Sequence, residues 1–149
     1  MEKRLSYSDK SEYLGTILKG QRHGKGVLRG ENGVIYEGEW KYDNFEGQGK
    51  LISEDGSIYI GTFLNGKKHG VGKNEKGNTI YEGEFKDNLK DGKGKEIYPN
   101  GNIYEGFFSQ GKKCGDGRYL LADGSFYEGQ FFNDNINGVV YKIINIGNL

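Results

Sequence analysis

Five residues of this sequence have side chains suited to metal binding or acid–base chemistry and recur at regular spacing. His23, Glu46, His69, Asp91 and Cys114 each stand directly before a glycine, 22 or 23 residues apart. Imidazole, carboxylate and thiolate groups are the usual zinc ligands. If this spacing marks successive pairs of strands, however, the two histidines lie roughly 19 Å apart, which no single ion bridges. The row therefore predicts a shared structural role at one edge of the fold and no metal site.

Two other patterns resemble catalytic or nucleotide-binding motifs. Paired glutamates with the spacing of general acid–base carboxylates occur twice, as Glu37 with Glu39 and as Glu82 with Glu84. Their register with Lys50 and Lys95 instead indicates cross-strand charge pairs, each worth about 0.2–1 kcal/mol. The segment Gly66–Gly70 has neither the residues nor the following helix of a phosphate-binding loop. We therefore expect no enzyme activity, no cofactor and no small-molecule substrate.

Charge and composition limit the possible partners. The chain has 21 basic and 21 acidic residues and a formal charge of zero, so a nucleic-acid-binding protein is not expected. Basic pairs at Lys67-Lys68 and Lys112-Lys113 alternate with acidic segments along the chain, and interposed acids weaken adsorption to an anionic membrane. There is no apolar run of membrane-spanning length, no signal-peptide pattern and only one cysteine, which together favour an intracellular, cytoplasmic or cytoskeletal protein.

An internal repeat defines the elements that must position these residues. A tyrosine is followed two positions later by glycine and four positions later by an apolar, usually aromatic residue. The repeats start at Tyr13, Tyr36, Tyr59, Tyr81, Tyr104 and Tyr127. Eleven positions after the tyrosine a Gly-x-Gly element begins, except that Val140 replaces its second glycine in the last repeat. With half a repeat at residues 4–12, we predict one array over residues 1–149 with no domain boundary.

Spacing within a repeat favours strands. Tyr36, Gly38 and Trp40 alternate with glutamates, and so dense a glycine pattern would cost a helix roughly 1 kcal/mol per glycine. Residues 41–46 are then predicted as a polar turn, residues 47–52 as a return strand and Glu54–Ser57 as a second turn. Each repeat is expected to be a β-hairpin with about six residues per strand. Stacked hairpins predict an all-β protein built as an elongated, twisted, antiparallel single sheet.

The glycines have a packing role in such a sheet. Because they lack a Cβ, Gly47 and Gly49 are expected to leave hollows in which a ring from a neighbouring strand lies flat. Tyrosine, glycine and Trp or Phe then share one face, while the glutamates point to the other. An aromatic layer packed on backbone would allow a single sheet to be stable although only 34% of residues are hydrophobic.

Two segments depart from the repeat. Gly72–Gly77 lies in a repeat that is one residue short, and it has no aliphatic pair comparable to Leu51-Ile52, so we expect a weak strand or a bend there. The last repeat ends in Val139–Ile144, which is typical of a terminal cap or of an edge strand available to a partner.

The repeat resembles the MORN repeat (membrane occupation and recognition nexus) over residues 4–142. The segments Tyr36–Trp40 (YEGEW) and Tyr81–Phe85 (YEGEF) fit the start of that motif, and a polar turn, Gly-x-Gly and Asp/Asn-Gly-x-x-Tyr follow. Acidic positions of the motif are replaced in three repeats, by Leu14, Thr16, Ile60, Thr62 and Phe107. The resemblance implies a rod-like or grooved array used as a scaffold, in ciliary (axonemal), junctional and cytoskeletal proteins or beside lipid-kinase and methyltransferase domains.

The predicted function is a non-enzymatic scaffold that grips a helix or extended peptide of a protein partner in a larger cytoskeletal or ciliary (axonemal) assembly. The candidate partner-binding residues are Tyr36, Trp40, Tyr59, Phe63, Tyr81, Phe85, Tyr104 and Phe108. If these rings are used only for internal packing, recognition moves to the turns or to the end strands at Leu5–Tyr7 and Val139–Ile144. The alternative is a module that binds phosphoinositides or an anionic membrane surface through Lys67, Lys68, Lys112 and Lys113.

Overall fold

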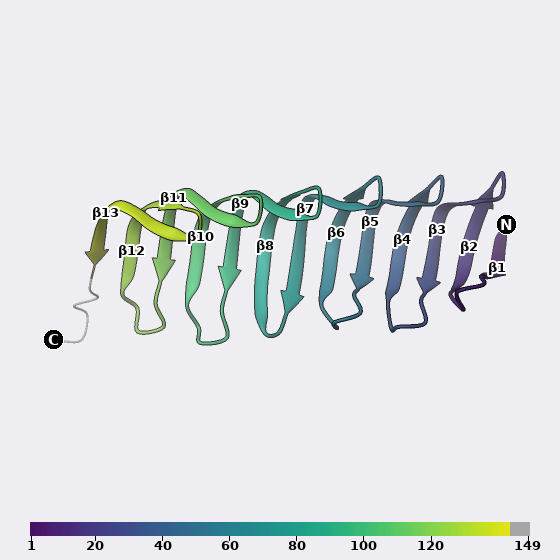
Figure 1. Cartoon of the computed structure of the whole chain (residues 1–149), viewed down its shortest axis with the longest axis horizontal. Coiled ribbons are helices and arrows are strands. Elements are labelled where there is room, and N and C mark those ends of the chain that lie inside the picture. The colour runs from purple at the N-terminus through teal and green to yellow at the C-terminus, as the bar shows by residue number, and fades with distance from the viewer. Residues whose placement is uncertain (144–149) are drawn as a thin grey trace.

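The described part of the protein is one long antiparallel sheet. A computed structural model describes residues 1–143, with side chains through residue 138. Within these residues thirteen strands lie side by side in chain order, so each strand pairs with its sequence neighbours, and the first and last strands lie at opposite ends of the array (Figure 1). No helix in this part of the chain is long and apolar enough to cross a membrane. The predicted all-β, elongated single sheet is confirmed.

The strands follow each other along the array. They are β1 (Glu2–Ser6), β2 (Glu12–Leu18), β3 (Gln21–Arg29), β4 (Ile35–Lys41), β5 (Asn44–Ile52), β6 (Ile58–Leu64), β7 (Lys67–Lys76), β8 (Thr79–Lys86), β9 (Leu89–Ile97), β10 (Ile103–Ser109), β11 (Lys112–Leu120), β12 (Phe126–Phe132) and β13 (Asn135–Ile143). Among the described residues β1 and β13 are the edges of the sheet. The predicted edge strand at the end of the chain therefore exists through Ile143, while its side chains and Ile144 lie outside the described residues.

Each hairpin closes through a turn of two residues. In the second repeat these are Tyr42 and Asp43, with φ of 47° and 69°, and both central residues of a type I′ turn need a positive φ. The prediction of a turn over residues 41–46 was therefore too long. β5 begins at Asn44 and has nine residues against seven in β4, so six residues per strand was also wrong.

The return strand contains a β-bulge at the first glycine of each Gly-x-Gly element. Gly38 lies opposite Gly49 and Glu39 lies opposite Glu46, so Gly47 and Gln48 are extra residues with no partner on β4. Gly47 has a φ of 61°, and a Cβ there would collide with the carboxylate of Glu39, not with a ring. The expected ring hollow at Gly47 was wrong, because this glycine is needed for its left-handed backbone and bends the strand.

The second glycine of each element lies under the tyrosine of its own hairpin. A Cβ on Gly49 would lie 2.5 Å from Oη and 2.6 Å from Cε2 of Tyr36, which confirms the predicted hollow at Gly49. The Tyr36 hydroxyl donates a hydrogen bond of 2.7 Å to the carbonyl oxygen of Glu39, where the strand bends. Paired glycines continue across the sheet from Gly15 on β2 to Gly129 on β12 as one row of backbone without Cβ atoms.

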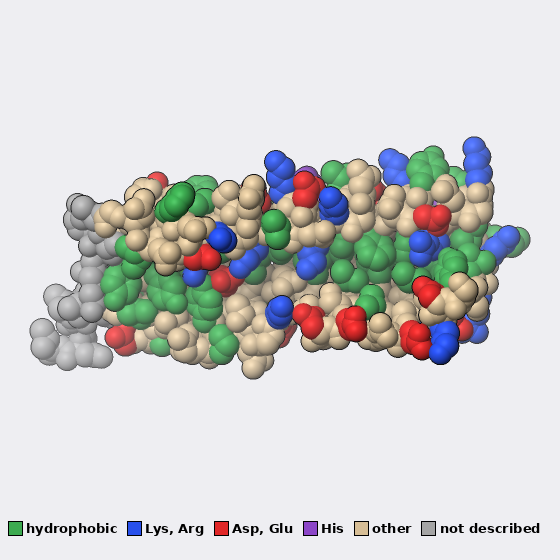
Figure 2. Space-filling view, in the orientation of Figure 1, with side chains coloured by type: hydrophobic (Ala, Val, Ile, Leu, Met, Phe, Trp, Pro, Cys, Tyr) green, Lys and Arg blue, Asp and Glu red, His purple; other side chains and the backbone are tan. Residues whose placement is uncertain are grey.

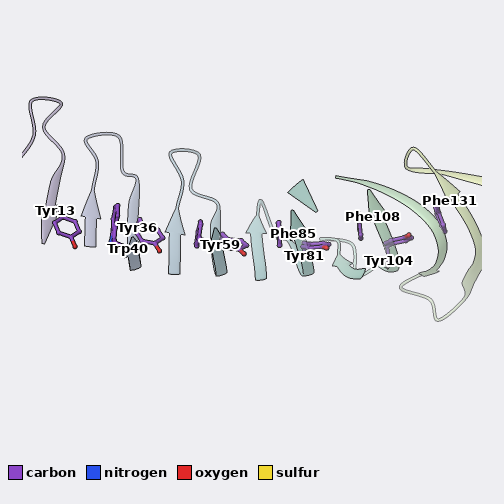
Figure 3. Close-up of a cluster of buried hydrophobic side chains, with 10 residues drawn as sticks. Tyr13, Tyr36, Trp40, Tyr59, Tyr81, Phe85, Tyr104, Phe108 and Phe131 are labelled. Atoms are coloured by element: carbon purple, nitrogen blue, oxygen red, sulfur yellow. The ribbon is translucent and has the colours of Figure 1, made fainter. Parts of the chain in front are cut away.

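Ten aromatic rings form the core along this row (Figure 3). Tyr36 meets Trp40 edge-on with ring centroids 5.0 Å apart, and it meets Phe63 of the next hairpin in the same way at 5.3 Å. Edge-to-face pairs of this kind contribute about 0.5–1.5 kcal/mol beyond the area that they bury. The rings thus connect each hairpin to the next, and the aromatic side chains share one face as predicted. We call it the aromatic face, and the opposite side the charged face.

The third repeat contains the longest strand, which continues without interruption through Gly72–Lys76. β7 has ten residues, and a two-residue turn at Gly77-Asn78, with φ of 55° and 65°, replaces the five-residue loop that the preceding hairpin has at Ser53–Ser57. β7 and β8 are each one residue longer than their counterparts β5 and β6. The expected weak strand was wrong because the missing residue comes from the loop, and the shorter turn extends the pairing.

The charged face carries the predicted cross-strand charges. Lys95 lies opposite Glu82 in the strand register, as expected, while its ammonium group lies 3.7 Å from Glu105. Glu82 forms its ion pair with Lys73 on its other side, at 3.6 Å. The second glutamate of each pair has a different role, because Glu39 accepts the Gln48 N–H of the bulge at 2.5 Å. The expected register with lysine is therefore confirmed for the first glutamate of each pair, Glu37 opposite Lys50 and Glu82 opposite Lys95, while the ion pair of Glu82 is made with Lys73.

Candidate functional site

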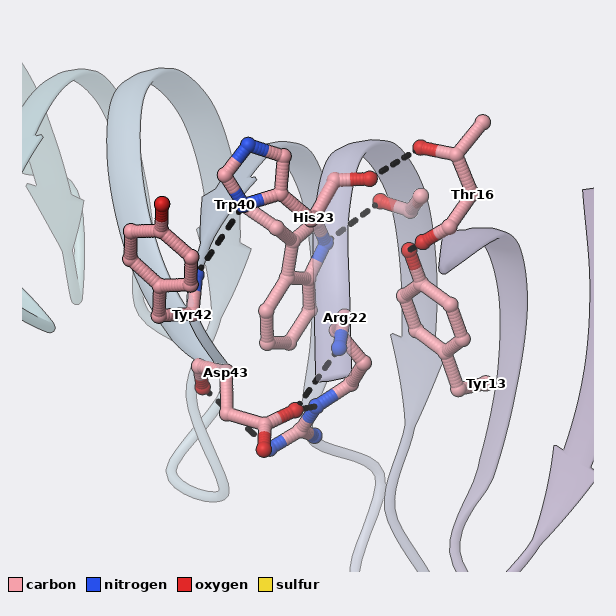
Figure 4. Close-up of polar contacts among 8 residues, drawn as sticks. Tyr13, Thr16, Arg22, His23, Trp40, Tyr42 and Asp43 are labelled. Atoms are coloured by element: carbon pink, nitrogen blue, oxygen red, sulfur yellow. Dashed lines mark hydrogen bonds and ion pairs between the residues drawn. The ribbon is translucent and has the colours of Figure 1, made fainter. Parts of the chain in front are cut away.

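The row that begins at His23 connects neighbouring hairpins. His23 Nδ1 accepts the N–H of Tyr42 at 3.3 Å (Figure 4), and the Glu46 carboxylate accepts the N–H of Asn65 at 3.0 Å. His69 differs, since its buried Nδ1 has no hydrogen bond and lies 4.0 Å from Asp87. No group of three or more potential metal ligands occurs among the described residues. The shared role at the turn edge is confirmed for His23, for Glu46 and for Asp91, whose carboxylate accepts the N–H of Gln110 at 3.1 Å.

Turns of neighbouring hairpins bind each other through their backbones. The backbone N–H of Arg22 donates to Asp43 Oδ1 at 2.8 Å, the guanidinium Nε reaches the same oxygen at 3.1 Å, and the N–H of Asp43 donates to the Arg22 carbonyl at 2.9 Å (Figure 4). The same backbone contacts join Lys68 to Asn88 and Lys113 to Asp134. These contacts connect successive hairpins along this edge, and the ion pair between Arg22 and Asp43 adds to them in the first two repeats.

The predicted partner-binding rings lie together, but inside the core. Their exposed fractions run from 0% for Tyr36 and Tyr104 to 6% for Phe85. The other five predicted rings fall within the same range: Trp40, Tyr59, Phe63, Tyr81 and Phe108. Partner contact by these rings stays a prediction, and the surface of the aromatic face is formed by a second layer of side chains above them.

We call this second layer the cover layer. In each of the first five repeats it consists of the residue nine positions after the tyrosine and the residue fifteen positions after it, which is the cross-strand neighbour of the tyrosine. Its five pairs are Arg22 with Leu28, Phe45 with Leu51, Lys68 with Asn74, Lys90 with Glu96, and Lys113 with Tyr119. All of these side chains are half-buried except Glu96, which is buried.

The first member of each pair lies over an aromatic ring. Phe45 stacks on Tyr36 with ring centroids 3.8 Å apart, and the Arg22 guanidinium lies 4.5 Å from the centroid of Trp40. Lys68 Nζ lies 5.1 Å from the Tyr59 ring centroid and Lys113 Nζ lies 5.2 Å from that of Tyr104. Cations at such distances from a ring face are stabilised by its quadrupole.

The chemistry of the cover layer changes along the array. The second repeat contributes two apolar side chains, whereas the next three repeats each contribute a lysine. Lys90 forms an ion pair with Glu96 at 2.5 Å, and the hydroxyl of Tyr98 donates to the same carboxylate at 2.7 Å. A band of hydrophobic side chains with cationic groups among them runs along the middle of the face shown in Figure 2.

The four predicted lipid-contact lysines fall into two classes. Lys67 and Lys112 are exposed, whereas Lys68 and Lys113 are half-buried in the cover layer. Burial lowers the pKa of Lys68 and of Lys113, since the charged form loses solvation. The four side chains therefore do not form one basic patch, and lipid contact by them stays a prediction.

A hollow opens in the aromatic face between the third and fourth pairs of the cover layer. It has a volume of about 530 Å³, and its lining includes Lys68, Asn74, Tyr81, Phe85, Lys90 and Glu96. Asn74 stands where the two preceding repeats have leucine, and the β7–β8 connection here is only the turn Gly77-Asn78. The less bulky side chain and the shorter connection leave this space beside the Lys68 ammonium group.

Sequence reasoning missed the cover layer, although a signal was present. The position nine residues after the tyrosine holds Arg22, Phe45, Lys68, Lys90 and Lys113, always a long or aromatic side chain. Side chains with apolar stems can cover a ring while their charged ends reach water. A row of such residues in step with the tyrosines indicates a layer above them.

Comparisons with known proteins agree with this architecture. The family model of the MORN repeat matches residues 13–35, 36–58, 59–73, 81–103, 104–126 and 127–139. Protein TIC 100 of Arabidopsis thaliana is 44% identical over 46 residues, which is 30% of this chain and 5% of that protein. This chain therefore matches only a small part of that relative's length.

Solved structures of similar fold exist. One of them is the TCP domain of SAS-4 (dCPAP) of Drosophila melanogaster, solved in complex with a proline-rich motif of Ana2 (dSTIL). The alignment has a TM-score of 0.50 and 16% identity, and it covers 87% of this chain and 77% of that chain. At this level of identity the likeness concerns the fold alone.

Proposed function

The chain belongs to the MORN-repeat family, and from this premise we propose that it is a non-enzymatic scaffold that binds a segment of a protein partner along the cover layer of its aromatic face. The cover layer is the observation that carries the proposal. It presents a line of half-buried apolar and cationic side chains that pack on the buried aromatic rings. Protein interfaces are rich in aromatic residues and arginine, and rigid side chains lose little entropy on binding.

The shape of the sheet suits an elongated ligand. The cover pairs repeat every two strands, so they follow the long axis of the array at intervals of roughly 10 Å. An extended peptide or a helix that lies along this axis would contact several pairs at once. The similar TCP domain of SAS-4 was solved with a proline-rich motif, which supports a peptide as the type of ligand that this fold can hold.

A cytoskeletal or ciliary assembly inside the cell is part of this proposal. Only the family resemblance supports it, and localisation of the tagged chain against axonemal tubulin would test it. A tag that stays diffuse in ciliated cells would contradict the ciliary setting and leave the binding function standing.

Site-specific photo-cross-linking tests the binding function. A benzophenone amino acid replaces Phe45 in the cover layer or, in a matched variant, Ile60, which is 52% exposed on the charged face. We expect a cross-linked protein from position 45 only, with the cross-linked segment identified by mass spectrometry. A synthetic copy of that segment should then bind the purified chain. Cross-links from position 60 alone would indicate that the partner binds to the charged face.

Binding to an anionic membrane is a second candidate function. The exposure of Lys67 and Lys112 favours it, since these two ammonium groups can approach a flat bilayer. Flotation with phosphoinositide-containing vesicles, repeated after Lys67→Gln and Lys112→Gln together, measures this binding. The scaffold proposal expects the chain to remain in the soluble fraction in both cases.

A further inference from the structure

Two lysines of the cover layer form no ion pair within the described residues. Among these residues no Asp or Glu oxygen lies within 4.0 Å of the ammonium group of Lys68 or Lys113, and the acidic groups that act on them, Asp55 on Lys68 and both Glu96 and Asp134 on Lys113, do so from farther away. Lys68 Nζ donates to the side-chain oxygen of Asn74 at 3.2 Å and lies over the ring of Tyr59. Lys113 Nζ is surrounded by the rings of Tyr98, Tyr104 and Tyr119, at 5.0, 5.2 and 5.5 Å.

The other cations of the same layer are paired. Lys90 binds Glu96 at 2.5 Å and Arg22 binds Asp43 at 3.1 Å. A half-buried charge loses part of its hydration, and burial lowers the pKa of both unpaired lysines. A charge left in this state forms a strong contact when a carboxylate reaches it in a partly dehydrated site.

We propose that Lys68 and Lys113 are the two anchor points for an extended acidic segment of a protein partner, which lies along the aromatic face and gives one carboxylate to each lysine. This inference rests on the proposed function and specifies the chemistry of its ligand. The hollow beside Lys68 has room for the first acidic side chain, and its walls at Tyr81 and Phe85 are aromatic. The rings around Lys113 form the corresponding site for the second acidic side chain.

The geometry sets the spacing of the two acids. Lys68 lies on β7 and Lys113 on β11, four strands apart, which is roughly 19 Å at about 4.8 Å per strand. An extended chain advances about 3.3 Å per residue. The matching ligand therefore has acidic residues at positions i and i+6, and the residue midway between them passes over the Lys90–Glu96 pair, which is already neutralised.

A membrane surface fits this pair of lysines less well. Lys68 and Lys113 are half-buried against rings, whereas their neighbours Lys67 and Lys112 are exposed, so a flat bilayer contacts Lys67 and Lys112 more readily. A single chain with side chains on short stems can enter the hollow. The two exposed lysines therefore provide a control that differs by one position in the sequence and removes the same charge.

Fluorescence anisotropy with synthetic peptides tests the proposal on the whole chain. The probes are labelled 14-residue peptides of Ser, Ala and Pro that carry two glutamates two, four, six or eight positions apart. We expect the tightest binding at six positions. Lys68→Gln with Lys113→Gln should weaken it by about tenfold or more, while Lys67→Gln with Lys112→Gln should change it less than about twofold.

A charge swap provides a second measurement that does not depend on loss of binding. Lys68→Glu with Lys113→Glu should reject the glutamate peptide and bind its counterpart with lysines six positions apart. If the glutamine pair fails to fold, Lys68→Arg with Lys113→Arg keeps both charges and should keep the spacing preference.

Several results would overturn the proposal. The first is an equal loss of peptide affinity in the two double glutamine variants, and the second is the same affinity for every spacing of the glutamates. The third is that no acidic peptide binds. The fourth is that inorganic phosphate or phosphoinositide vesicles displace the labelled peptide at a lower concentration than the unlabelled peptide does. Cross-linking at position 45 separates this failure from that of the scaffold function. If a cross-linked partner binds equally well after Lys68 and Lys113 are replaced, the scaffold function is supported, and only the proposal of an acidic ligand is excluded.

Discussion

The aromatic face has two layers, and they differ in how they vary from repeat to repeat. The lower layer is nearly constant, since each of the first five repeats places a buried tyrosine against a glycine and donates its hydroxyl to the carbonyl three positions later. The cover layer above it changes at every repeat, from Phe45 with Leu51 to Lys68 with Asn74 and Lys113 with Tyr119. The lower layer is constant because its tyrosine rings pack directly on glycine backbone, where a side chain of another shape would not fit.

The difference indicates where specificity is located. A repeat protein is stabilised by contacts that every unit shares with its neighbours, so the residues of strongest periodicity are those that hold the array together. Residues that vary within the period are free to differ and can match one particular ligand. The strongest sequence signal, the tyrosine and its glycines, therefore marks stability, and the candidate binding surface lies above it.

The largest expected effect comes from ionising the lower layer in alkali. Burial raises the pKa of Tyr59 and of Tyr104 to about 12, whereas tyrosine in an unfolded chain has a pKa of about 10. Below pH 10 both states hold the proton and stability is unaffected by these groups. Between about pH 10 and 12 the unfolded state releases the proton first, so the free energy of unfolding falls.

Urea denaturation followed by circular dichroism at pH 8, 10 and 11 measures this loss. We expect unfolding of the whole sheet as the tyrosines ionise together. Exposed tyrosines such as Tyr7 and Tyr42 contribute their own phenolate absorbance, so the test is the part that the buried tyrosines add. If that part also rises near pH 10 while the strand signal stays intact, the buried rings are open to solvent and the two layers are not distinct.

A Cβ placed in the lower layer should have the next largest effect. In Gly49→Ala the new atom would fall 2.5–2.7 Å from atoms of the Tyr36 side chain, and we expect a loss of about 3 kcal/mol, at the upper end for overpacking. Gly30→Ala is the matched control, since its Cβ meets Val34 at an ordinary 3.5 Å. Thermal melting should separate the two by roughly 6 °C or more.

Similar melting temperatures for the two alanine variants would mean that the tyrosine moves away at little cost. The last repeat carries valine at the second glycine position, and Val140→Gly is expected to be nearly neutral. The side chain of Val140 lies outside the described residues, so that comparison stays a prediction.

The sequence predicted the lower layer well because its geometry follows from composition. Period-two spacing with glycine requires strands, and glycine opposite tyrosine requires a ring on backbone. The strand boundaries were predicted less accurately. In the sequence Gly47 looks like a turn residue, but it lies inside β5 with a left-handed backbone. The shorter third repeat was misjudged for a related reason: a missing residue does not show whether the loop or the strand has lost it.

The cover layer could not be predicted in the same way. Lysine beside a turn is normally solvated, and residue type alone does not distinguish Lys67, which is exposed, from Lys68, which lies over Tyr59. The two-residue bulge decides this, because it sets which side chains of the return strand face the rings. Sequence therefore located the aromatic face and its buried rings, while the exposed surface of that face is formed by the cover layer above them.

A conservative change in the lower layer should reduce stability without affecting recognition. Phe85 is 6% exposed and packs edge-on against Tyr59 and Tyr81, so Phe85→Leu is expected to cost about 1–1.5 kcal/mol. Binding of the partner segment, measured below the melting transition, should stay within about twofold of the original. Phe45→Leu in the cover layer is the matched variant and should weaken binding instead. A large loss of affinity in Phe85→Leu would indicate that the partner contacts the rings of the lower layer.

The smallest effect on stability is expected from Asn74→Leu. Leucine stands at the equivalent positions Leu28 and Leu51, so the cover layer can hold it, and its contact with Tyr59 should offset the lost hydrogen bond to Lys68. The free energy of unfolding should change by less than about 0.5 kcal/mol. Binding of an acidic peptide should nevertheless weaken, because leucine reduces the hollow beside Lys68. Chemical denaturation and peptide titration on the same preparation measure both quantities. A cost equal to that of Phe85→Leu would mean that the cover layer is as structural as the rings beneath it, and that variation along the array reflects packing and not a ligand.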